Sequence, residues 1–97
     1  MNELADRIVA LGVGQQDEYE NLYWLGNGQP MGDKLFTRSW EVAGALMEKC
    51  VRRQFLINIA HDGAVFVYPA SGVDPSQSHE NILPHAINQA CVEALEA

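Results

Sequence analysis

The chain has 97 residues, of which 47% are hydrophobic, and its 13 acidic and 6 basic residues give a net charge of −7. This length predicts a single domain over residues 1–97, since domains usually hold roughly 100–150 residues, and the apolar content excludes a disordered chain. The shortage of Lys and Arg argues against direct nucleic-acid binding, because contacts to phosphates need clustered cations. An acidic surface instead suits a soluble protein, or one whose partner is basic.

The cysteines and the start of the chain indicate a cytoplasmic protein. Cys50 and Cys91 stand in apolar stretches, so we expect two buried thiols in a reducing compartment, with a Cys50–Cys91 bridge as the alternative. The first residues lack the basic start and apolar run of a signal peptide, and no stretch reaches the roughly 20 apolar residues that span a bilayer. The histidines, His61, His79 and His85, have no standard ligand spacing, so no metal and no cofactor are expected.

The first third of the chain predicts a helix, a strand and a loop. Leu4 and Ile8 begin an apolar spacing of four and three that predicts a helix, which glycines end. The stretch from Tyr19 to Leu25 is rich in aromatic residues and predicts a strand. Glycines and a proline then predict a loop over residues 26–36.

A second helix is predicted from Thr37, whose hydroxyl is expected to cap it by accepting an orphan amide hydrogen. The apolar residues of this helix define the face that should be buried. They are Trp40, Ala43, Met47 and Val51, extended by Val42, Leu46 and Cys50.

The remaining residues predict a hairpin, a polar loop and a last helix. In residues 54–69, apolar runs flank Asp62-Gly63, the preferred pair for a two-residue type I′ turn. Residues 69–81 read as a loop, and the last helix is expected to begin at Pro84, which only a first turn tolerates. The order is α-β-α-β-β-α. We therefore expect an α+β fold in which a small antiparallel sheet of about three strands is sandwiched by helices.

Three acids, Asp17, Glu18 and Glu20, precede the predicted first strand. They are predicted to steer the protein onto a basic groove of a partner, where Tyr23 and Trp24 would act as aromatic anchors. A solvated loop and buried aromatic rings are the structural alternatives. No nucleophile or base stands beside the acids, so we expect no catalytic residue and no enzyme activity.

A second candidate site lies just before the predicted second helix, at Lys34, Phe36 and Arg38. Two cations beside an aromatic ring, with free amides at the helix start, could hold the phosphate of a signalling nucleotide. The segment Gly26-Asn27-Gly28 is not surrounded by the strand, lysine and helix of a phosphate-binding loop and reads as a turn.

Three stretches carry a family resemblance: NELADRIVALGVG over residues 2–14, FTRSWEV over residues 36–42, and PHAINQACVEAL over residues 84–95. In these stretches the chain resembles the phage ABA sandwich domain family of small phage and prophage proteins. The resemblance implies a sheet sandwiched by helices and a phage or prophage origin, and it supplies no catalytic residue. Small acidic phage proteins often block a host defence, and that analogy suggests an anti-CRISPR-like role.

The sequence thus predicts a non-enzymatic phage or prophage accessory protein in the host cytoplasm. It would bind and inhibit or modulate a host protein with a basic surface, without direct contact to nucleic acid or membrane. The alternative is a sponge that sequesters a signalling nucleotide at residues 34–38. A scaffold that forms homo-oligomers is the third reading.

Overall fold

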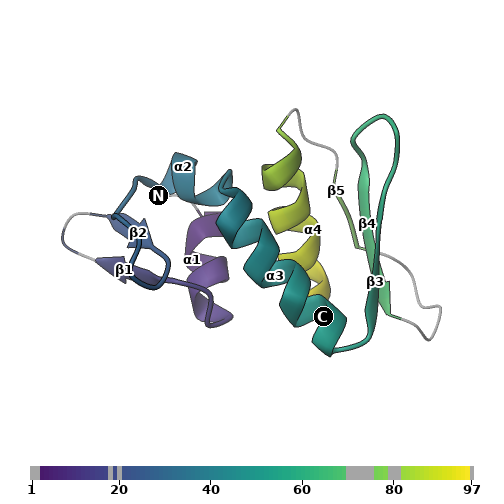
Figure 1. The fold of residues 1–97 in the computed structure, drawn as a ribbon, viewed down its shortest axis with the longest axis horizontal. Helices are drawn as coiled ribbons and strands as arrows, with labels where there is room; N and C mark the ends of the chain where they lie inside the picture. The colour runs from purple at the N-terminus through teal and green to yellow at the C-terminus, as the bar shows by residue number, and fades with distance from the viewer. Residues whose placement is uncertain (1–2, 18, 20, 70–75, 79–81, 97) are drawn as a thin grey trace.

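The computed structural model describes residues 3–17, 19, 21–69, 76–78 and 82–96. The elements are α1 (Glu3–Ala10), β1 (Gln15–Asp17), β2 (Leu22–Trp24), α2 (Asp33–Thr37), α3 (Trp40–Arg52), β3 (Phe55–Ile59), β4 (Val65–Pro69), β5 (Ser76–Ser78) and α4 (Leu83–Glu96). They fill an elongated volume of 41 × 26 × 22 Å, in which the helices lie between the β1–β2 hairpin and a three-stranded sheet (Figure 1). No helix in the described ranges combines the length and the apolar character needed to cross a bilayer.

The predicted fold class is confirmed: helices pack against a small antiparallel sheet of strand order β3-β4-β5. The predicted order α-β-α-β-β-α is incomplete, because the structure adds β1, α2 and β5, the last of which lies within the predicted loop over residues 69–81. The layers also differ from the prediction. Helix α3 contacts β3, and α4 contacts β4 and β5, so both helices cover the same face of this sheet. Within the described chain the second β layer is the β1–β2 hairpin, which lies beyond the helices rather than beneath the sheet (Figure 1).

Helix α4 is the centre of the core. It contacts α1 and α3 as well as the three-stranded sheet, and its buried residues therefore extend around most of its circumference. It begins at Leu83, so Pro84 occupies the first turn as expected. The amide Nδ2 of Asn88, a fully buried side chain, donates to the carbonyl oxygen of Thr37 at 2.9 Å and so ties α4 to the end of α2.

Helix α3 begins later than predicted and buries only part of the predicted face. The Ser39 hydroxyl, not that of Thr37, accepts from the amides of Glu41 and Val42, because α2 already incorporates Thr37. The extension residues Val42, Leu46 and Cys50 are buried together with Ala43, whereas the side chains of Trp40 and Val51 are 60% and 63% exposed. The helix carries two adjacent apolar stripes, and α4 covers the one that holds the smaller residues.

Two turns also differ from the prediction. The residues from Tyr19 to Leu25 do not form one strand, because the chain reverses between β1 and β2 and leaves Tyr19 in the turn. In the β3–β4 hairpin only Gly63 has a positive φ, of 91°, so the turn is not type I′, which needs two such residues. The Gly63 amide donates to the Ala60 carbonyl and the Ala60 amide to Ala64, which closes a three-residue loop instead.

Candidate binding sites

The β1–β2 hairpin positions the predicted acidic and aromatic residues. Gln16 pairs with Tyr23 and Asp17 with Leu22. Gly14 leads into β1 with a φ of 80°, and a Cβ atom there would lie 2.8 Å from the Trp24 carbonyl oxygen. Only glycine allows this approach, so the position of the hairpin depends on Gly14.

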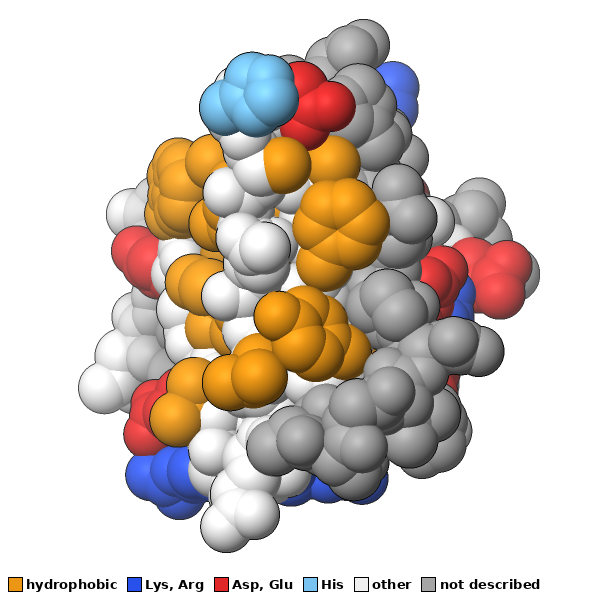
Figure 2. Space-filling model, turned by 90° about the vertical axis from the view of Figure 1, so that its right-hand side faces the viewer, with side chains coloured by type: hydrophobic (Ala, Val, Ile, Leu, Met, Phe, Trp, Pro, Cys, Tyr) orange, Lys and Arg blue, Asp and Glu red, His pale blue; other side chains and the backbone are white. Residues whose placement is uncertain are grey.

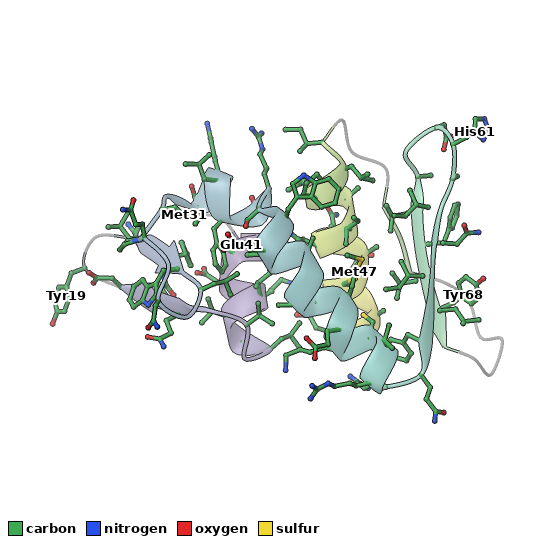
Figure 3. All side chains as sticks on the ribbon, viewed as in Figure 1. Tyr19, Met31, Glu41, Met47, His61 and Tyr68 are labelled. Atoms are coloured by element: carbon green, nitrogen blue, oxygen red, sulfur yellow. The ribbon has the colours of Figure 1, made fainter. Side chains whose placement is uncertain are left out.

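The tip of the hairpin presents Tyr19. Its amide donates to Oδ1 of Asp17 at 3.0 Å, which folds the turn, and its side chain is 99% exposed. Figure 3 shows the ring pointing away from the body of the protein at the far end of the hairpin. Asp17 and Tyr19 therefore stand together at the tip, whereas Glu18 and Glu20 lie outside the described residues.

Tyr23 is buried, with 2% of its side chain exposed, which removes it from the surface where an anchor was predicted. Its hydroxyl donates to Oδ1 of Asp6 at 2.6 Å and accepts from Nε2 of Gln16 at 3.2 Å. Its ring stacks on Phe36, with centroids 5.1 Å apart. Burial and the hydrogen bond to Asp6 raise the pKa of Tyr23 to about 12. The residue holds the hairpin onto α1 and α2, and its neighbour Trp24 remains half-buried.

The predicted nucleotide residues do not converge. Lys34 and Arg38 are exposed on α2 and just after it, whereas Phe36 is fully buried beneath Tyr23. Residues two apart on a helix point in nearly opposite directions, so the ring cannot join the two cations on one ligand. The face of the Phe36 ring, which was predicted to stack on a nucleotide base, is covered by Tyr23.

A groove that sequence reasoning missed lies where the C-terminal half of α3 passes the loop after α1. It has a volume of about 330 Å³ and is lined by Gly12, Val13, Gly14, Leu25, Ala45, Glu48, Lys49 and Arg52. A second hollow of about 240 Å³ shares two of these residues and is lined by Leu11, Lys49, Arg52, Arg53 and Leu95. We call the two together the basic groove.

The basic groove gathers Lys49, Arg52 and Arg53, half of the six basic residues of the chain. Arg52 donates to Oε1 of Glu48 at 2.7 Å, and Arg53 donates to the Leu95 carbonyl at 2.9 Å. The clustering of three cations within residues 49–53 is the signal in the sequence from which this groove could have been predicted.

The cysteines face one another across the α3–α4 interface. Both Cys50 and Cys91 are free and fully buried. The hydrogen bond with Cys50 and burial raise the pKa of Cys91, so this thiol stays protonated and unreactive. Among the residues that the structure describes, no three His, Cys, Asp or Glu side chains gather as a metal site. Of the histidines, His61 lies in the β3–β4 turn, His85 lies in α4, and His79 is outside the described residues.

No family model, no curated protein and no solved structure matches the chain. The resemblance to the phage ABA sandwich domain therefore stays a prediction from sequence. The hairpin tip and the basic groove are the two candidate binding sites of the described part of the chain.

Proposed function

We propose that the chain is a non-enzymatic binding protein that docks onto another protein through the tip of the β1–β2 hairpin. The observation that carries the proposal is the 99% exposure of Tyr19, whose ring points away from the protein body while its amide donates to Asp17. Tyrosine is among the residues that most often dominate protein interfaces, since a rigid ring buries a large area at low entropic cost. A fully exposed ring at a hairpin tip removes the largest apolar area from water when a partner covers it, and so contributes most to the binding free energy.

The charge of the tip favours a basic partner. The Asp17 carboxylate lies beside Tyr19, and Glu18 and Glu20 flank the same ring in the sequence of a chain with net charge −7. Carboxylates attract Lys and Arg over long range, and the ring face can receive a cation directly. The protein would act by occluding a basic groove of a host protein. A phage or prophage origin and an anti-defence role follow from the sequence resemblance and belong to this proposal.

The test is affinity capture from a lysate of the host bacterium with wild-type protein and two tyrosine variants. Tyr19→Ala is expected to weaken capture of the principal partner at least tenfold, because losing an interface anchor costs about 2 kcal/mol or more. Tyr68→Ala, which alters a tyrosine on the sheet at the other end of the molecule, serves as the matched control and should leave capture unchanged. High salt should weaken the wild-type complex. Equal capture by Tyr19→Ala and wild type would refute docking through the tip.

The basic groove favours a second function, the binding of a small anionic ligand. Lys49 supplies positive charge beside the backbone of Gly12 to Gly14, next to the ion pair of Arg52 with Glu48, and Val13 and Leu25 supply apolar lining. This combination suits a ligand that carries a phosphate and a flat apolar group, such as a nucleotide. It replaces residues 34–38 as the site of the predicted nucleotide sponge.

A thermal-shift screen with linear and cyclic nucleotides tests this second function. A true ligand at about 100 times its Kd stabilises the fold by about 2.7 kcal/mol and raises the Tm accordingly. Lys49→Ala should abolish the shift and Lys34→Ala should preserve it, since Lys34 lies on α2, outside the lining of the basic groove. The reverse pattern would place the ligand site at residues 34–38. The absence of any shift would refute the second function and leave docking through the hairpin tip as the only proposal.

A further inference from the structure

Strand β3 is an edge of the three-stranded sheet, and no described element continues the sheet beyond it. The Ala60 amide donates to the carbonyl of its cross-strand neighbour Ala64. Backbone groups alternate in direction along a strand, so Asn58 and Leu56 also turn theirs toward β4. The amides and carbonyls of Phe55, Ile57 and Ile59 therefore point away from β4, toward the open edge.

Within the described ranges, this edge carries none of the usual protections against pairing with another strand. The sequence of β3 is FLINI, with no charge and no proline, and its pairing with β4 runs from Phe55 to Ile59 without a bulge. Natural edge strands are normally blocked by a lysine, a proline, a bulge or a covering segment. The side chains of Leu56 and Ile59 are nevertheless 51% and 45% exposed. An unblocked apolar edge implies that something covers it.

The face of the sheet that α3 and α4 leave open is apolar as well. Figure 2 faces this outer side and shows hydrophobic side chains gathered over the sheet. The register places Leu56 beside Tyr68 and Asn58 beside Phe66 on it, while Val65 and Val67 point inward to the core. A strand added to β3 would continue this surface.

We propose that β3 pairs with β3 of a second copy of this chain, antiparallel and about a two-fold axis through Ile57. In this register Ile57 faces Ile57 of the second copy, and Phe55 faces Ile59. It is the longest symmetric register, because all three outward-facing residues of each copy then find a partner. Two three-stranded sheets become one of six strands.

The charges at the two ends of β3 match this arrangement. Arg52 and Arg53 precede the strand, and His61 and Asp62 follow it. Figure 2 shows basic side chains with an acidic one beside them at one end of the sheet, and a histidine beside an acidic side chain at the other. Antiparallel pairing brings the basic turn of each copy to the acidic turn of the other, twice. A strand parallel to β3 would instead set like charges side by side.

The pairing also accounts for the exposed Ile59. On the helix-facing side of the joined sheet, Ile59 of one copy lies beside Phe55 of the other, and aromatic rings pair favourably with β-branched side chains across strands. The hairpin tips lie at the opposite end of each copy (Figure 1), so the dimer leaves both free to bind. The test of the dimer is therefore independent of the proposed docking through the hairpin tip.

Sedimentation velocity at high micromolar concentration tests the dimer. The wild-type protein should sediment as a dimer, and Ile59→Lys should sediment as a monomer, because a lysine at the edge opposes strand pairing. Leu35→Lys is the matched control, since Leu35 is likewise an exposed leucine, at 66%, but lies on α2 and not on the sheet. A monomeric wild type, or an Ile59→Lys variant that remains dimeric, would overturn the proposal.

Cysteine pairing tests the register without relying on a destabilising change. In the proposed dimer Leu56 of one copy faces Asn58 of the other, in a pair with Cα atoms about 4.5 Å apart, which a disulfide can bridge. Leu56→Cys and Asn58→Cys variants are mixed and then oxidised mildly. A disulfide between the two different variants, in excess over either homodimer, is the expected result. If each variant forms disulfides only with itself, or if no disulfide forms, the register is wrong. Binding of a different protein to β3 in place of the second copy would overturn the dimer.

Discussion

The strands of the two β regions at the ends of this molecule each carry a tyrosine, and the two tyrosines are placed in opposite ways. The β1–β2 hairpin turns Tyr23 inward, where the ring stacks on Phe36 and the hydroxyl bonds to Asp6. The three-stranded sheet keeps Tyr68 and Phe66 on its outer face, which no described helix covers. The hairpin thus depends on buried contacts for its position, whereas the sheet has an apolar outer face that no described helix covers.

The difference follows from the placement of the helices. They stand between the two β regions, so each region has one covered side (Figure 1). The hairpin has only two short strands and needs its one large buried ring to stay attached, since a lone two-stranded hairpin is marginal in water. On the inner side of the sheet Val65 and Val67 are buried, and Phe55 and Ile57 pack against the same core, whereas the aromatic residues of the outer side do not belong to that core. A tyrosine in the two places should therefore differ greatly in its contribution to stability.

The largest expected effect is that of Tyr23→Ala. Removing a large buried aromatic side chain costs about 3–5 kcal/mol of unfolding free energy, which for a domain of this size removes much of the stability. Tyr68→Ala removes the same side chain from a half-buried position on the sheet and should cost about 1 kcal/mol or less. Urea unfolding of both variants at equal protein concentration measures the two values. Similar losses would mean that the outer face of the sheet is as necessary to the fold as the hairpin core.

Much of the fold could be predicted from local pattern. The β3–β4 hairpin and the helices over Glu3–Ala10 and Leu83–Glu96 follow from alternation and from apolar spacing. The β1–β2 reversal could not be read in this way, because its turn has neither glycine nor proline and Asn21 supplies the positive φ, of 54°. Helix α2 has five residues, too few for a periodic signal.

The candidate site was harder to predict because burial is decided by distant residues. Tyr23 is apolar and aromatic in sequence, and nothing nearby indicates that Asp6 and Phe36 will enclose it. Tyr19 was placed in a strand, although it is the residue that the turn exposes. The acidic character of the tip was predictable from sequence, whereas the identity of its aromatic anchor required the fold.

The next effect concerns the glycine that sets the hairpin against the helices. In Gly14→Ala the added Cβ would meet the Trp24 carbonyl oxygen at 2.8 Å and Cζ of Phe36 at 2.9 Å, at a φ of 80°. Left-handed backbone strain and overpacking together should cost about 2–4 kcal/mol. Gly63→Ala in the β3–β4 turn is the matched control, since its φ is 91° but nothing lies within 4 Å of the new atom. It should cost about 1–2 kcal/mol, from strain alone. If chemical denaturation shows equal losses of unfolding free energy for the two variants, the hairpin can shift to accommodate the added Cβ without further cost.

The smallest effect at neutral pH, and the most specific, is that of Tyr23→Phe. The variant keeps the stacked ring but loses the hydrogen bond to Asp6, which should cost about 1 kcal/mol near pH 8. The pKa of Tyr23 is raised to about 12 by burial and by that hydrogen bond, above the value of about 10 in an unfolded chain.

The phenol thus stabilises the wild-type fold fully below pH 10, and this contribution is lost as the pH rises through 12, because the unfolded chain releases its proton first. Over that window the stability of the wild type relative to Tyr23→Phe should fall by up to about 2–3 kcal/mol and change sign. Tyr19→Phe, which removes a fully exposed hydroxyl, should follow the wild-type curve. Unfolding free energies measured from pH 8 to 12 test this prediction. Parallel curves for wild type and Tyr23→Phe would mean that folding does not raise the pKa of Tyr23.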